Sequence, residues 1–348
     1  STRKESSAAS DVYKRQVLLL LIHHTAGDGG SLLPLLEDLR LCWRARAAGQ
    51  HPQLPPLTVQ YADYALWQRT LLSEAPGANA RHSQQLDYWC QQLADVPEEV
   101  TLPADRPRPT QADYRGDRVD FALPDELLSR LKTRSEEMGV SLFMLLHAAL
   151  ATLMHRLGAG DDIVIGTPLY ARSDAALLPL IGYFANTAVL RTDMGGNPTL
   201  SDIVAQAKSA VLEANQHQDL PFEQVVEALA PGRTLARHPL FQVMMVVDTP
   251  WPQAVTFPQV AVAQRQLPTT TAKFDLLFHF DVDDAQQRLS GHIEYATALY
   301  DDRTVAGFAG QLIRVIETIA QRPEARLAQV PLLLSLIHIS EPTRRRGI

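Results

Sequence analysis

Short apolar runs alternate with amphipathic segments along most of the chain. The runs are rich in β-branched and aliphatic residues and predict buried strands at 17–22, 118–123, 163–169, 186–193 and 241–248. Apolar residues at helical spacing predict helices at 32–49, 60–73, 83–94, 124–139, 141–158, 199–216 and 302–321. Segments 273–284 and 288–296 predict a hairpin in which Phe274, Leu276, Phe278 and Phe280 share one face. Strands mixed with helices indicate an α/β domain with a mixed sheet.

Composition excludes several classes of protein. The 348 residues are 46% hydrophobic and 20% charged, which is typical of a globular protein. A net charge of −7 without a basic stretch in the body of the chain argues against a nucleic-acid partner. Two cysteines, Cys42 and Cys90, make no disulfide framework and favour a reducing, cytoplasmic setting. The run 17–22 is far shorter than the roughly 20 residues of a membrane span, so neither a span nor a signal peptide is predicted.

The two ends differ from the body of the chain. Residues 1–16 contain DVYKRQ and residues 335–348 contain SLIHISEPTR, and both stretches resemble translations of sequencing-library adapters. We expect both ends to be non-native tails and leave them out of the fold prediction. The alternative is a pair of genuine polar tails.

The first apolar run leads into a histidine pair, His23 and His24, followed by Asp28 and Gly29. A histidine at a strand end is more often a hydrogen-bonded core residue than a catalyst. Neighbouring residues on an extended segment point to opposite sides, so the two rings cannot easily share one metal ion. We therefore expect no metal site here, with one imidazole facing a cavity and the other held in the core. His147, His155, His279 and His292 are interpreted as structural histidines with satisfied ring nitrogens.

Five motifs follow one another in a specific order: HHTAGDG (23–29), YADYALWQ (61–68), IGYFANTAVLR (181–191), HQDLPFE (217–223) and ARHPLFQVMM (236–245). Together they resemble the motifs of condensation domains of nonribosomal peptide synthetases, the HHxxxDG superfamily. The third motif is similar to the family's (I/V)GxFVNTxxxR pattern. Two departures are Gly30, where the family usually has Trp, and Ala185, where it has Val.

The resemblance implies an α/β, two-lobed fold with mixed sheets, similar to chloramphenicol acetyltransferase. Family members carry a long segment before the histidine motif. Residues 17–58 would then be a remnant of the N-terminal lobe, and 59–334 a complete C-terminal lobe. We therefore expect an N-terminally truncated domain whose N-terminal lobe is mostly missing, and we expect this fragment to be inactive.

The resemblance also implies the reaction and its participants. The amine of a carrier-bound aminoacyl acceptor attacks a carrier-bound donor thioester and forms a peptide bond. The domain would need no cofactor of its own, because donor and acceptor carrier domains supply the 4′-phosphopantetheine arms. An adenylation domain would be adjacent in the same synthetase, and the domain would act as a monomeric module.

By the same resemblance His24 is the catalytic residue. An imidazole suits proton transfer from the amine near neutral pH, and whether it acts as a base or a positioning group stays open. His23, Asp28 and Gly29 would be structural, with Asp28 paired to Arg172.

Gly30 and Asn186 are candidates for the substrate tunnel. Glycine lets the backbone approach the thioester and leaves an amide for the oxyanion, but Gly30 could equally serve a tight turn. Asn186 has an amide suited to a tunnel wall, and asparagine before a strand is as often a turn residue.

Three alternatives remain. One is an epimerisation-type domain, although IGYFANT and HQDLPFE fit the condensing type better. The second is a free-standing acyltransferase that uses coenzyme A thioesters. The third is a non-catalytic scaffold that binds carrier domains.

Overall fold

The computed structural model describes residues 17–72, 80–229, 232, 234–248, 257, 260 and 270–332. Both tails that we predict to be non-native therefore lie outside the described residues. The chain divides into two compact units. The first runs to Tyr61 and includes 172–184, and the second comprises 62–171 and the chain from Ala185 onward. The break at Tyr61 is close to the predicted boundary, whereas 172–184, predicted as part of the C-terminal lobe 59–334, groups with the first unit.

The first unit is built from short turns and one long helix. Its elements are the 3-10 turns η1 (His24–Ala26), η2 (Gly29–Ser31) and η3 (Ala175–Leu177), and helix α2 (Leu32–Ala47). The predicted strand at 17–22 is wrong: the segment forms no strand, and Val17 to Leu21 are exposed. A strand needs a neighbour to accept and donate its backbone hydrogen bonds, and the described part of this unit contains no other strand.

The second unit contains a six-stranded mixed sheet, so the predicted fold class is confirmed. Its strand order is β1-β6-β5-β4-β2-β3. Strand β4 pairs in parallel with β2 and β5, and the other neighbours are antiparallel. The strands are β1 (Gly116–Ala122), β2 (Asp162–Tyr170), β3 (Ala185–Asp193), β4 (Val243–Asp248), β5 (Leu276–Asp283) and β6 (Arg288–Ala296). The expected late hairpin is β5–β6.

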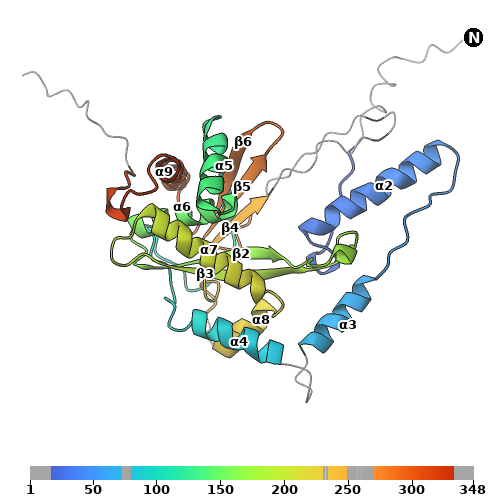
Figure 1. The fold of residues 1–348 in the computed structure, drawn as a ribbon, viewed down its shortest axis with the longest axis horizontal. Coiled ribbons are helices and arrows are strands. Elements are labelled where there is room, and N and C mark those ends of the chain that lie inside the picture. Colours follow the sequence, from blue (N-terminus) through green and yellow to red (C-terminus); the bar gives the residue numbers. More distant parts are fainter. Residues whose placement is uncertain are drawn as a thin grey trace, which may run out of the picture. The chain divides into compact units, whose positions relative to one another are not determined.

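Helices cover both faces of this sheet (Figure 1). Four of them pack along one face: α5 (Leu127–Met138), α6 (Leu142–Arg156), α7 (Leu200–Gln216) and α9 (Asp302–Gln321). Helices α4 (Ala80–Gln92) and α8 (Phe222–Leu229) pack on the other face. The remaining elements of the chain include α3 (Tyr61–Leu71) and η4 (Leu327–Gln329), which follows α9. Taken singly, no helix in the described residues is long and apolar enough to cross a membrane. Helices α5 and α6, bent by 102° at their junction, pass that test together by length and composition only.

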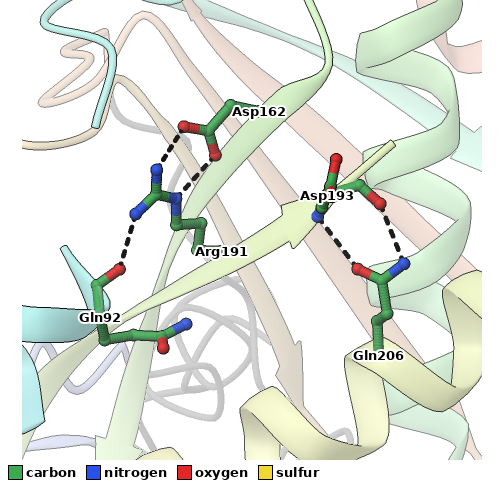
Figure 2. Close-up of a pocket in the computed structure, with 5 residues that line it drawn as sticks. All are labelled: Gln92, Asp162, Arg191, Asp193 and Gln206. Atoms are coloured by element: carbon green, nitrogen blue, oxygen red, sulfur yellow. Dashed lines mark hydrogen bonds and ion pairs between the residues drawn. The ribbon is translucent and has the colours of Figure 1, made fainter. Parts of the chain in front are cut away.

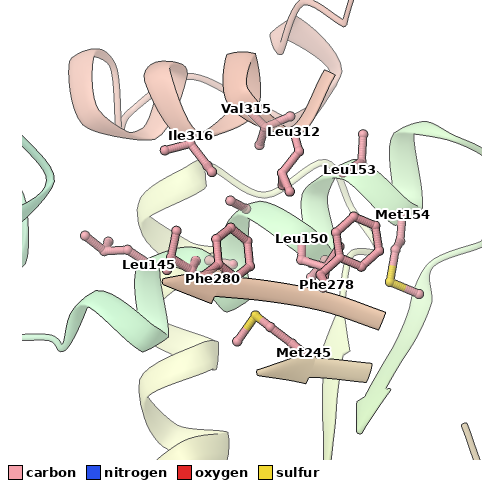
Figure 3. Close-up of a cluster of buried hydrophobic side chains, with 14 of the residues drawn as sticks. Leu145, Leu150, Leu153, Met154, Met245, Phe278, Phe280, Leu312, Val315 and Ile316 are labelled. Carbon is pink, nitrogen blue, oxygen red and sulfur yellow. The ribbon is translucent and has the colours of Figure 1, made fainter. Parts of the chain in front are cut away.

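The larger hydrophobic core lies between the sheet and α5, α6, α7 and α9. Phe278, Phe280 and Met245 from the strands pack against Leu150 of α6 and Leu312 of α9 (Figure 3). Strand alternation explains this arrangement, because every second residue of β5 points to the same face.

A smaller core on the opposite face includes Trp89 of α4 and Val225 of α8. Phe274 packs with this second cluster and stacks on Phe241, with ring centroids 5.4 Å apart. The prediction that Phe274 shares a face with Phe278 and Phe280 is therefore wrong. The reason is that β5 begins only at Leu276, so the alternation does not extend back to residue 274.

The predicted structural histidines differ in how well they are satisfied. His155 has its Nδ1 2.9 Å from the carbonyl oxygen of Gly160. His279 and His292 stack across β5 and β6 with ring centroids 4.8 Å apart. His147 corrects the prediction: it is fully buried in α6, and neither ring nitrogen has a hydrogen-bond partner in the described structure. Burial lowers the pKa of His147 to about 4.

We expect His147→Leu to stabilise the protein. Removing the two unpartnered nitrogens should raise the free energy of unfolding by about 1 to 3 kcal/mol, because leucine has a similar volume and no polar group to desolvate. The unfolded chain binds a proton at His147 below pH 6.5 and the folded chain only near pH 4, so the wild type loses stability as the pH falls through this window. The advantage of the variant should grow over the same window and stay constant above it.

Urea unfolding of both proteins between pH 7.5 and 4 measures this difference. The other histidines contribute equally to the pH dependence of both unfolding free energies, so their contributions cancel in the difference. A less stable variant with an unchanged pH profile would mean that His147 has a polar partner.

Candidate active site

His23 caps the turn that carries the histidine pair. Its Nδ1 accepts a hydrogen bond from the backbone N–H of Thr25 at 3.3 Å and lies 2.8 Å from the Thr25 hydroxyl. The expectation that one of the pair is held in the core is not met, since both His23 and His24 are exposed. No described segment of the first unit covers His23, and its contacts are local to the turn.

His24 is held through one ring nitrogen. Its Nδ1 lies 3.0 Å from the carbonyl oxygen of Gly27. A carbonyl oxygen only accepts, so Nδ1 carries the hydrogen and donates it. In the neutral ring Nε2 is then the acceptor. The ring also meets Tyr183 edge to face, with centroids 5.0 Å apart and planes at 90°. The turn therefore presents a nitrogen acceptor on an exposed residue.

Asp28 is the buried centre of this region, with a side chain that is 1% exposed. Arg172 binds both carboxylate oxygens, at 2.9 Å to Oδ1 and 3.0 Å to Oδ2. The backbone N–H of Phe184 donates to Oδ2 at 2.9 Å, and that of Ser31 donates to Oδ1 at 3.0 Å. Burial raises the pKa of Asp28, but the hydrogen bonds from Arg172, Phe184 and Ser31 outweigh it and hold the pKa below its usual value. Asp28 is thus a persistent anion.

Ser31 is a member of this network that the sequence analysis missed. Ser31 directly precedes α2, yet its side chain makes no capping bond to that helix. Its hydroxyl oxygen instead accepts from the backbone N–H groups of Asp28 and Gly182, each at 3.1 Å, and lies 2.8 Å from the Gly182 carbonyl oxygen. The spacing Asp28-x-x-Ser31 fits a reciprocal capping box around η2 and could have indicated this role.

Gly30 lies against the guanidinium of Arg172. A Cβ on Gly30 would sit 2.3 Å from a terminal nitrogen of Arg172, which is closer than any real contact allows. The Arg172 side chain is 6% exposed and also lies over the ring of Phe184, 4.2 Å from its centroid. This close approach gives Gly30 a packing role that the tunnel interpretation did not include. Gly29 begins η2 and is exposed.

Asn186 belongs to the second unit and is not part of this network. Its side-chain nitrogen donates to the carbonyl oxygens of Gln218 at 2.9 Å and Leu220 at 2.7 Å. Its oxygen accepts from the backbone N–H groups of Thr187 at 2.8 Å and Phe222 at 3.0 Å. The amide is fully engaged in tying β3 to the segment before α8. This geometry favours a bracing role over the predicted place in a tunnel wall.

A polar cavity of about 470 Å³ lies elsewhere in the second unit (Figure 2). Its lining residues are Gln92, Asp162, Arg191, Asp193 and Gln206. Arg191 binds both oxygens of Asp162, at 2.9 and 2.8 Å, and the carbonyl oxygen of Gln92 at 3.0 Å. None of the predicted site residues lines this cavity, and its arginine is already neutralised. Within the described ranges, no three His, Cys, Asp or Glu side chains are grouped to hold a metal ion.

Comparison with known proteins identifies the family. The model of the family "Condensation domain" matches residues 11–336, so the match begins within one predicted tail and ends within the other. A Salinispora arenicola protein described as "Probable non-canonical nonribosomal peptide synthetase (NRPS) CymA" is 43% identical over 321 residues, which are 91% of this chain and 4% of that protein. The dimodular nonribosomal peptide synthase of Bacillus subtilis is 39% identical over 331 residues, 94% of this chain and 14% of the synthase. The chain thus spans a small part of these curated relatives.

Solved structures support the predicted fold. The X-domain from teicoplanin biosynthesis is 35% identical with a TM-score of 0.81, and the match covers 90% of this chain and 71% of that one. The first condensation domain of the calcium-dependent antibiotic synthetase, bound to a substrate analogue, is 21% identical with a TM-score of 0.70, covering 90% and 66%. At that identity the likeness concerns the fold alone. The prediction that the N-terminal lobe is mostly missing is not supported by these matches and stays a prediction.

We expect Asp28 and Arg172 to be strongly coupled. Asp28→Ala or Arg172→Ala alone leaves a buried charge unpaired and should cost about 3 to 5 kcal/mol of unfolding free energy. The double variant should cost clearly less than the sum of the single ones. Urea unfolding of the four proteins measures the coupling. The matched control is the exposed pair of Glu126, which precedes α5, and Arg130, which lies in α5; its coupling should stay within about 1 kcal/mol. Additive losses at Asp28 and Arg172 would contradict the network.

Gly30→Ala should displace the Arg172 guanidinium and lower the free energy of unfolding by more than about 1 kcal/mol. Gly307→Ala is the matched control, because Gly307 lies within α9 and a Cβ there meets nothing within 4 Å. That variant should raise stability by up to about 1 kcal/mol, since alanine loses less backbone entropy in a helix. Thermal unfolding compares the two, and equal effects would show that Gly30 is not constrained by Arg172.

Proposed function

This chain belongs to the condensation-domain family, and we propose that the domain it represents catalyses amide formation between two carrier-bound substrates. The inactivity of the 348-residue fragment by itself stays a prediction. In this reaction the amine of the acceptor attacks the carbonyl carbon of the donor thioester. The new C–N bond forms, the C–S bond breaks, and the proton lost by the amine is balanced by the one that the thiol leaving group gains.

The observation that carries the proposal is the tautomer of His24. The hydrogen bond from Nδ1 to the Gly27 carbonyl leaves Nε2 as an acceptor at an exposed position. An acceptor ammonium must lose a proton before it can attack, and a neutral imidazole nitrogen can take or orient that proton. We assign this role to His24.

Asp28 supports the site without exchanging protons. Its carboxylate is buried, doubly bound by Arg172 and kept ionised by the hydrogen bonds that lower its pKa. A group whose charge is this strongly stabilised is a poor proton carrier near neutral pH. We assign structural roles to His23 and Gly29 as well, because His23 caps η1 and Gly29 begins η2, the two turns that carry His24 and Asp28.

The proposed partners follow from the family and from the curated relatives. They are donor and acceptor carrier domains, whose 4′-phosphopantetheine arms deliver the substrates, and an adjacent adenylation domain. The relatives are described as peptide synthetases of which this chain matches only 4% and 14%, which supports a place within a larger assembly. We further propose that the domain acts as a monomeric module in the cytoplasm.

A second candidate function is a scaffold that binds other proteins without turnover. One observation favours it: the X-domain of teicoplanin biosynthesis, solved also in complex with OxyB, is 35% identical to this chain. The condensation domain solved with a substrate analogue is 21% identical. The two candidates differ in whether the protein forms an amide product, and only the catalytic candidate requires His24.

We expect His24→Ala to reduce amide formation by about 100-fold or more, given the usual contribution of a general acid–base group. The protein carrying this sequence, produced from its complete gene, is mixed with one donor-loaded and one acceptor-loaded carrier, and the product is followed by mass spectrometry in single turnover. The control is His51→Ala, an exposed histidine of the first unit, which should leave the rate unchanged. Product formation that is insensitive to His24→Ala would remove this residue from the mechanism. Carrier binding without any product would favour the scaffold.

A further inference from the structure

Tyr183 makes an aromatic contact to the proposed catalytic histidine and has no part in the chemistry above. The residue is 40% exposed, and its ring meets the ring of His24 edge to face, with centroids 5.0 Å apart. The residue lies between Gly182 and Phe184, where the family pattern GxF leaves the position open. Its contribution therefore belongs to this chain rather than to the motif.

The backbone that carries Tyr183 is held on both sides and at its own carbonyl. Gly182 bonds to the hydroxyl of Ser31 through its N–H at 3.1 Å, and Phe184 donates its N–H to Asp28 at 2.9 Å. The carbonyl oxygen of Tyr183 accepts from the hydroxyl of Tyr61 at 2.8 Å.

Gly182 also permits the close approach of Tyr61. A Cβ on Gly182 would lie 2.1 Å from the Tyr61 ring, so no larger residue fits without displacing it. The backbone that carries the Tyr183 ring is thus held in place by these contacts.

The ring of His24 needs a second constraint if Nε2 is to keep one direction. The hydrogen bond from Nδ1 to Gly27 fixes one edge of an otherwise exposed imidazole. An edge-to-face contact between aromatic rings has a preferred geometry and opposes rotation of the ring away from it. We propose that Tyr183 is a positioning residue that holds the His24 imidazole in the orientation set by its Nδ1 hydrogen bond. The catalytic consequence rests on the proposed function, whereas the orientation itself does not.

The first test needs no turnover. The 348-residue chain is labelled at histidine Cε1, and the His24 signal is assigned by its loss in His24→Ala. Tyr183→Leu should move this signal, because the ring current of the tyrosine is lost and the imidazole samples other orientations. Tyr183→Phe keeps the ring and should leave the signal close to the wild-type position.

Leu178→Ala is the matched control, since Leu178 is an exposed apolar residue of the same segment, 172–184. It should leave the His24 signal unmoved. A His24 signal that is the same in Tyr183→Leu and in the wild type overturns the proposal, as does an equal displacement in Tyr183→Phe and Tyr183→Leu.

The second test measures catalysis in the protein produced from its complete gene. Tyr183→Leu should lower kcat about three- to tenfold, with little change in KM for either carrier, and Tyr183→Phe should restore it. An unchanged kcat in Tyr183→Leu would overturn the catalytic part. If the wild type forms no amide while the His24 signal still responds to Tyr183→Leu, the proposed function fails and the orientation of His24 by Tyr183 stands.

Discussion

The buried ion pair between Asp28 and Arg172 is the constraint on which the first unit depends. Helix α2 contributes no buried residue to this unit, and the apolar segment at 17–21 is exposed, so its described part has little hydrophobic core. The carboxylate and guanidinium are instead removed from water together, at 1% and 6% exposure. Either charge alone in that position would cost several kcal/mol. Through Ser31 and the N–H of Phe184, the pair joins the histidine turn to a segment that lies about 150 residues later in the chain.

The second unit is stabilised in a different way. Its sheet buries apolar side chains on both faces, with Phe278 and Phe280 on one and Phe241 on the other. Asn186 of this unit braces the segment 218–222, whereas His147 lies in the core without a hydrogen-bond partner in the described structure. Hydrophobic burial spread over many residues tolerates unpartnered polar groups such as His147, because many contacts together supply the stability. The described part of the first unit has no comparably large hydrophobic core. Its few polar contacts depend on one another, because they share Asp28, Ser31 and Arg172.

This difference explains how far the sequence could predict the structure. Strands and helices of the second unit were predictable because their periodicity is local: alternation marks β5, and Ser141 and Gly139 mark helix ends. The run at 17–22 has the same composition as a buried strand. A strand forms only beside a second strand, however, and the local sequence pattern does not show whether one is present. The packing role of Gly30 was not predictable either, since it follows from the guanidinium of a residue far away in the chain. Pairing Asp28 with Arg172 came from the family resemblance, and no spacing rule would have found it.

The motif places two ionisable side chains four residues apart and gives them opposite environments. Asp28 is buried, and its pKa is lowered by the donors around it, whereas His24 is exposed and bound at one nitrogen. The two are also linked through Gly27, whose carbonyl accepts from His24 and whose next residue caps η2. A displacement of Asp28 would therefore move the carbonyl that sets the His24 tautomer. The ion pair acts on chemistry through the backbone of one turn, without any direct contact between the carboxylate and the imidazole.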